Sequence, residues 1–139
     1  RGLPVQGLAL EGLTRIAGLS RKELLEKLPR SLEHLTFSDN FNESLEGTIM
    51  AGMGSMGSRL QSLTFGKYFN QSLDSVMLPG SLQNLIFGHR FNQSLERVSL
   101  PSNLRSLTLG DRFNQSLEGM TLPGSLETFS HGLLLVSSV

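Results

Sequence analysis

The chain has 139 residues, a length that suits one modest domain. Its 12 Lys and Arg residues balance 12 Asp and Glu residues, so there is no electrostatic case for binding nucleic acid or an anionic membrane surface. It contains no cysteine, which excludes disulfides, thiolate metal sites and cysteine nucleophiles, and no apolar run approaches the ~20 residues of a transmembrane segment.

The N-terminal stretch differs in pattern from the rest of the chain. Ser20 and Glu23 have the spacing of a helix capping box, and Pro29 ends the pattern. An earlier apolar spacing from Leu10 to Ala17 is typical of another short helical turn. We therefore predict a small N-terminal helical cap over residues 1–27, which would cover the open end of whatever follows.

Residues 28–139 are built from a repeated unit of 22 residues. Copies run over residues 28–49, 56–77, 78–99 and 100–121, and a fifth begins at Leu122 and fades. The first two copies are separated by extra residues in the Gly-, Ser- and Met-rich stretch 50–58, which is typical of a loop insertion. The spacing predicts about five stacked coils.

Within one unit, the apolar spacing indicates one short strand. Leu85 and Phe87 are two positions apart, the period that places both side chains on one face of a strand. Gly88 permits a turn that other residues resist, and a proline at each unit's corner, such as Pro101, cannot lie inside a sheet ladder. We expect a mainly β repeat solenoid with one short parallel strand per coil and columns of Leu and Phe buried between coils.

This pattern resembles known repeat families. Leu82-x-x-Leu85-x-Phe87 matches the first half of the leucine-rich repeat, L-x-x-L-x-L-x-x-N-x-L, but Asn92 comes two positions late. The match to the FNIP repeat, whose units look like LPxSLxxLxFGxxFNQxL, is closer and extends from Leu28 to about Gly132, with Ser where that family usually has Pro after Gln. The resemblance implies a leucine-rich-repeat-like scaffold used for binding, without catalytic residues or cofactors.

The pentamer FNQSL, or FNESL in the first copy, carries an asparagine in every unit: Asn42, Asn70, Asn92 and Asn114. Each is also part of an Asn-x-Ser glycan acceptor pattern. Glycans on every coil would collide, because neighbouring strands in a sheet lie ~4.8 Å apart. We favour a structural ladder in which the amides turn inward and bond backbone groups of their own and neighbouring coils.

Residues that vary between copies are the candidates for partner binding. We expect them on the surface just after the strand, together with one residue of the strand's outer face. Arg and Tyr are the strongest candidates because they are enriched at interface hot spots. The alternative is that these residues form a solvent-exposed edge that binds no partner. The candidates are Tyr68, Arg90, Arg112, Lys67, His89 and Ile86.

No catalytic, metal-binding or phosphate-binding motif is found, so we predict a chain that is not an enzyme. The favoured function is a protein–protein interaction scaffold. The alternatives are a structural accessory subunit of a larger assembly and, more weakly, a carbohydrate- or surface-binding module. The apolar end, Leu133–Val139, is a candidate edge for contact with a protein partner.

Overall fold

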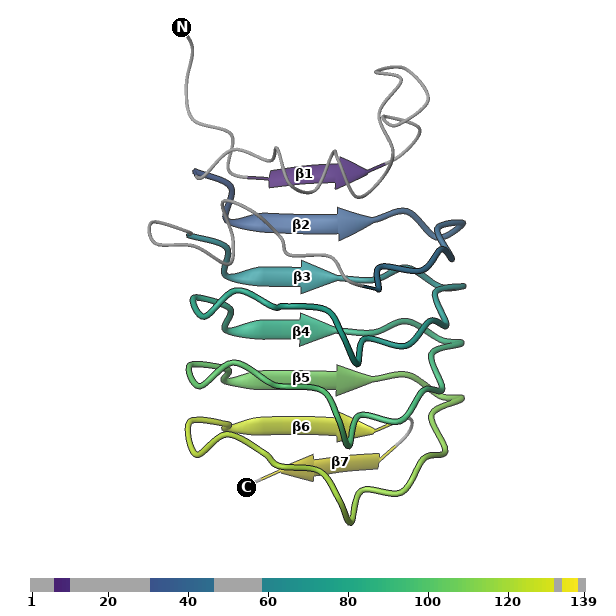
Figure 1. Ribbon diagram of the computed structural model, residues 1–139, viewed down its shortest axis with the longest axis vertical. Helices are drawn as coiled ribbons and strands as arrows, with labels where there is room; N and C mark the ends of the chain where they lie inside the picture. The colour runs from purple at the N-terminus through teal and green to yellow at the C-terminus, as the bar shows by residue number, and fades with distance from the viewer. Residues whose placement is uncertain (1–6, 11–30, 47–58, 132–133, 138–139) are drawn as a thin grey trace, which may run out of the picture.

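The computed structural model describes residues 7–10, 31–46, 59–131 and 134–137. These residues form one seven-stranded sheet whose strands follow the order of the chain (Figure 1). β1 to β6 are parallel, and β7 runs antiparallel to β6. The strands are β1 (Gly7–Leu10), β2 (His34–Phe37), β3 (Ser62–Thr64), β4 (Asn84–Ile86), β5 (Ser106–Leu109), β6 (Thr128–His131) and β7 (Leu134–Ser137).

Each 22-residue unit makes one turn of a solenoid. Leu63, Leu85, Leu107 and Phe129 are paired in register on successive strands and lie 22 positions apart, so three complete turns separate β3 from β6. The alternation along β5 is half-buried, buried, half-buried, buried, as expected for a strand with one face on a core. The predicted mainly β parallel solenoid is therefore confirmed.

The core consists of columns of identical side chains stacked between coils. The rings of Phe69 and Phe91 stack with 6.1 Å between centroids and 1° between planes, and within one coil Phe87 and Phe91 lie 3.9 Å apart. All three of these side chains are buried. Because one coil has no second layer of its own, its apolar face is covered only when the next coil is added.

A glycine column lies where the coils approach most closely. A Cβ atom on Gly88 would lie 2.2 Å from the carbonyl oxygen of Gly66, and one on Gly110 would lie 2.2 Å from that of Gly88. The backbone of Gly88 is not in the left-handed region. We expected Gly88 to be glycine because of the backbone freedom that a turn requires, and this explanation is wrong. The residue is glycine because the preceding coil leaves no room for a side chain.

The two ends differ from the sequence-based expectation. Gly7–Leu10, inside the predicted helical cap, form the strand β1, which pairs with β2. The rest of the predicted cap, including Ser20 and Glu23, lies outside the described residues, so the helical cap is not confirmed. Among the residues that the structure describes, no helix is long and apolar enough to cross a membrane.

After β6 the chain reverses direction, and β7 runs back along β6 as an antiparallel strand. Leu135 pairs with Ser130 in the antiparallel register of β6 and β7. β7 is the last strand of the sheet, so the predicted contact edge Leu133–Val139 includes an edge strand. The fading of the fifth repeat corresponds to this reversal.

Candidate functional site

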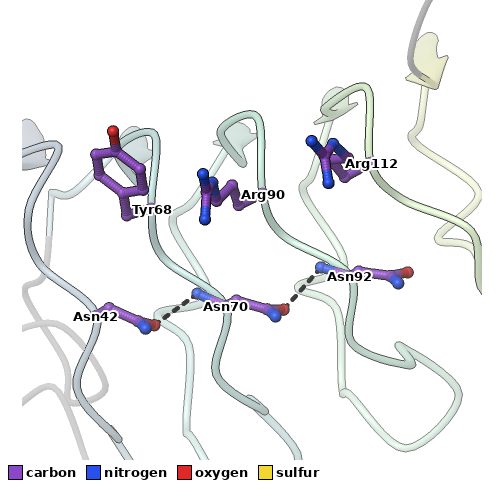
Figure 2. A pocket seen from close by; sticks show the side chains of 6 residues that line it. All are labelled: Asn42, Tyr68, Asn70, Arg90, Asn92 and Arg112. Atoms are coloured by element: carbon purple, nitrogen blue, oxygen red, sulfur yellow. Dashed lines mark hydrogen bonds between the residues drawn. The ribbon is translucent and has the colours of Figure 1, made fainter.

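The asparagines of the repeated pentamer form a hydrogen-bonded ladder from coil to coil. The backbone N–H of Asn70 donates to Oδ1 of Asn42, that of Asn92 to Oδ1 of Asn70, and that of Asn114 to Oδ1 of Asn92, each at 2.8 Å. Figure 2 shows the first three side chains lying end to end along the stack. They lie along the stack and bond the backbone of the neighbouring coil, whereas we expected from the sequence that the amides would turn inward and bond backbone groups of both their own and neighbouring coils.

A glutamine from each following coil strengthens the ladder. Nε2 of Gln93 donates to Oδ1 of Asn70 at 3.0 Å and to the carbonyl oxygen of Asn70 at 3.3 Å, and Gln71 and Gln115 repeat both contacts one coil away. Each inner Asn oxygen thus accepts two hydrogen bonds from the next coil, which uses both of its lone pairs. The ladder holds the backbone of successive coils in one fixed register.

Beside this ladder lies a polar hollow of about 360 Å³. Its wall is made by Tyr68, Arg90 and Arg112, which come from the turns that follow β3, β4 and β5 and lie in one row (Figure 2). Asn42, Asn70 and Asn92 complete the lining. Three of the six candidate binding residues therefore lie around one hollow.

Two cationic groups lie within cation–π distance of the aromatic ring of Tyr68. The guanidinium carbon Cζ of Arg90 lies 4.8 Å from the ring centroid, and Nζ of Lys67 lies 5.5 Å from it. A cation at this distance is attracted by the ring face, by about 0.5–1 kcal/mol at an exposed site. The contact places the guanidinium of Arg90 beside the ring of Tyr68.

The remaining candidates lie near the hollow but do not line it. His89 precedes Arg90, and its Nδ1 lies 3.3 Å from Oδ2 of Asp111. The backbone N–H of Lys67 donates to Oδ1 of Asp39 at 3.0 Å. Ile86 is half-buried on the outer face of β4, away from this row. Lys67 and His89 thus flank the hollow, whereas Ile86 belongs to a different surface.

Arg90 and Arg112 are exposed, and neither pairs with a carboxylate of residues 31–46 or 59–131. Among residues 31–46 and 59–131, the ion pairs formed are His89 with Asp111 and Arg105 with Glu127. The lining of the hollow carries two guanidinium groups and no acidic side chain. It therefore presents a local positive charge on a chain whose formal net charge is zero.

A second hollow, of about 550 Å³, lies by the turns that precede the strands. Arg105 and Glu127, which belong to its lining, approach to 2.6 Å and neutralise each other. Sequence reasoning did not single out this pair, although opposite charges 22 positions apart were a usable signal. No group of three or more His, Asp or Glu side chains capable of holding a metal ion occurs in the described parts of the chain.

Sequence reasoning also missed that the ladder asparagines share the hollow with the binding candidates. The signal was present, because Tyr68, Arg90 and Arg112 each stand two residues before an asparagine of the ladder. In a solenoid, two positions with a fixed separation in every unit form two parallel rows on the surface when the coils stack. One row is variable and the other constant.

Comparisons with known proteins agree with this architecture. The model of the FNIP repeat matches residues 54–90 and 91–130. A comparison with curated protein sequences gives no match. A similar solved structure is described as "The crystal structure of CroV588 a novel circular LRR protein structure"; it shares 36% sequence identity and a TM-score of 0.50 over 76% of this chain.

The matched region covers 18% of that protein, so this chain spans less than a fifth of the length of its structural relative. Both the strand-per-coil geometry and the pentamer in every unit agree with the family match, which covers more than half of the chain. Repeats of this type commonly mediate protein interactions, and nothing in either comparison points to catalysis. The chain belongs to the FNIP repeat family, a leucine-rich-repeat-like group.

Proposed function

We propose that the chain is a non-enzymatic protein-interaction scaffold whose partner binds at the hollow lined by Tyr68, Arg90 and Arg112. The observation that carries the proposal is the alignment of these three variable side chains in one exposed row. The asparagines beside the row are the same in each coil, whereas the row itself changes from tyrosine at position 68 to arginine at positions 90 and 112. A constant frame with a variable row is the arrangement that repeat proteins use for specific partners.

The row has the composition of an interface hot spot. Tyr and Arg are the residue types that most often dominate interface energetics, because they combine contact area with directional hydrogen bonding. Tyr68 is 37% exposed, so its ring offers a surface to a partner while Arg90 rests against it. Lys67 and His89 are candidates for the rim of the same interface.

Site-specific photo-crosslinking tests the proposal. A photoreactive phenylalanine analogue is placed at position 68 and, as a matched control, at the exposed Ser99, which does not line the hollow. The protein is then irradiated in an extract of the cells that produce it. We expect one discrete protein adduct from position 68 and none from position 99. Equal labelling at both positions, or no adduct at position 68, would contradict the proposal.

A second candidate function, a structural subunit of a larger assembly, is favoured by the sheet ends. In the described chain β1 and β7 are the edge strands, and edge strands present backbone groups that another chain can pair with. The structural relative is circular, and this chain corresponds to a small part of it. Purification of a stoichiometric neighbour that crosslinks through β7, but not through position 68, would favour this alternative.

A further inference from the structure

The positive charge of the hollow is the starting point for an inference about the partner's chemistry. The exposed acidic side chains Glu46, Asp74, Glu96 and Glu118 repeat with the ladder but do not line the hollow. Arg90 and Arg112 do line it. Although the chain is neutral overall, these acidic side chains lie outside the hollow and two of its arginines line it. A partner that approaches the hollow therefore meets positive charge.

Among residues 31–46 and 59–131, no carboxylate forms an ion pair with these two arginines. Asp111 faces His89 at 3.3 Å, and Oδ1 of Asp39 accepts the backbone N–H of Lys67 at 3.0 Å. Both are exposed, and neither lines the hollow. The two guanidinium groups keep their hydrogen-bond donors available on the solvent side.

The arrangement of the two guanidinium groups favours carboxylates over a single phosphate. Each coil contributes one guanidinium, and strands of adjacent coils are ~4.8 Å apart. A guanidinium presents a planar fork that fits one carboxylate through two parallel hydrogen bonds. Two guanidinium groups on separate coils can each bind one carboxylate. A single phosphate would instead require the donors of both groups to converge on one point. The guanidinium of Arg90 also lies against the ring of Tyr68.

We propose that the hollow binds an acidic, extended segment of a protein partner, with one Asp or Glu carboxylate on Arg90 and a second on Arg112. In an extended segment, residues i and i+2 share a face and lie about 6.7 Å apart, a distance that long Glu and Arg side chains span. The inference rests on the proposed scaffold function and adds the class of ligand.

Fluorescence anisotropy with defined peptides tests the inference. The probe is a labelled peptide of alternating glutamate and glycine, compared with one of alternating glutamine and glycine and one of alternating phosphoserine and glycine. We expect binding of the glutamate peptide and none of the glutamine peptide. Raising the ionic strength from about 0.1 M to about 1 M shortens the Debye length from ~10 to ~3 Å and should weaken the binding.

Variants then locate the site. Arg90→Gln and Arg112→Gln should each raise the dissociation constant for the glutamate peptide about tenfold. Arg112→Lys should lose part of the affinity because it keeps the charge and loses the fork. The control Arg97→Gln removes the same charge from an exposed arginine outside this hollow and should leave the dissociation constant unchanged.

Three results would overturn the inference: no binding of the glutamate peptide, an equal loss in Arg97→Gln, or much tighter binding of the phosphoserine peptide. The crosslinking experiment separates this failure from failure of the scaffold function. A discrete adduct at position 68 without glutamate-peptide binding leaves the scaffold standing with a different ligand chemistry. No adduct at position 68 refutes the scaffold itself.

Discussion

The side-chain oxygen of Asn70 accepts the backbone N–H of Asn92, a residue 22 positions later, at 2.8 Å. The same oxygen accepts Nε2 of Gln93 at 3.0 Å. One amide therefore joins two consecutive coils at the edge of the hollow, where no regular strand ladder satisfies the backbone. The link lies beside the row formed by Tyr68, Arg90 and Arg112.

Removing a ladder amide should destabilise the stack. Asn70→Ala leaves the N–H of Asn92 and the amide of Gln93 without their acceptor, so we expect a loss of about 1–2 kcal/mol in the free energy of unfolding. Asn114→Ala is the control, because its Oδ1 accepts no hydrogen bond from the described residues. Its cost should stay below about 0.5 kcal/mol. Urea denaturation measures both, and equal losses would contradict the ladder.

The glycine column should be required for stability because the space between coils admits no larger side chain. In Gly88→Ala the new methyl group would lie 2.2 Å from the carbonyl oxygen of Gly66, which forces the coils apart. We expect a loss of about 1–3 kcal/mol, the range for overpacking. A methyl group on Gly80 meets nothing within 4 Å, so Gly80→Ala should change stability little or raise it by up to about 1 kcal/mol. Thermal unfolding followed by circular dichroism compares the two, and a neutral Gly88→Ala would refute the close approach.

Leucines at equivalent positions of different coils should contribute differently to the stability of the fold. Leu95 is 1% exposed and Leu117, one repeat later, is 38% exposed. Leu95→Ala should cost about 2–5 kcal/mol through loss of buried area and a residual cavity, whereas Leu117→Ala should cost on the order of 1 kcal/mol. Chemical denaturation of the pair gives the comparison. Similar costs would mean that another part of the protein covers Leu117.

The exposed pair Arg105–Glu127 should contribute little to stability despite its short distance. Both side chains are more than half exposed, so solvent screens their attraction. A double-mutant cycle with Arg105→Ala and Glu127→Ala should give a coupling of about 0.2–1 kcal/mol that disappears at high salt. A salt-independent coupling above this range would show that the second hollow is shielded from solvent.

The repeat, the strand position and the buried columns were predictable from the sequence. Leu85 and Phe87 are two positions apart and their places recur every 22 residues, so their burial follows from local periodicity alone. The asparagine ladder was predictable in kind, because an amide that recurs beside the core in every unit has to satisfy backbone groups. The direction of the amides along the stack was not predictable, since it depends on how one coil is placed on the next.

Contacts between coils and the behaviour of the ends required the tertiary structure. The reason for Gly88 is the carbonyl oxygen of Gly66, which lies 22 residues away in the chain and 2.2 Å from the position of a Cβ atom. The pairing of β1 with β2 and the reversal into β7 decide where the sheet stops. The sequence by itself determined what one coil buries, because that pattern is local. Only the tertiary structure decided how Tyr68, Arg90 and Arg112 meet around one hollow, because their proximity arises from stacking.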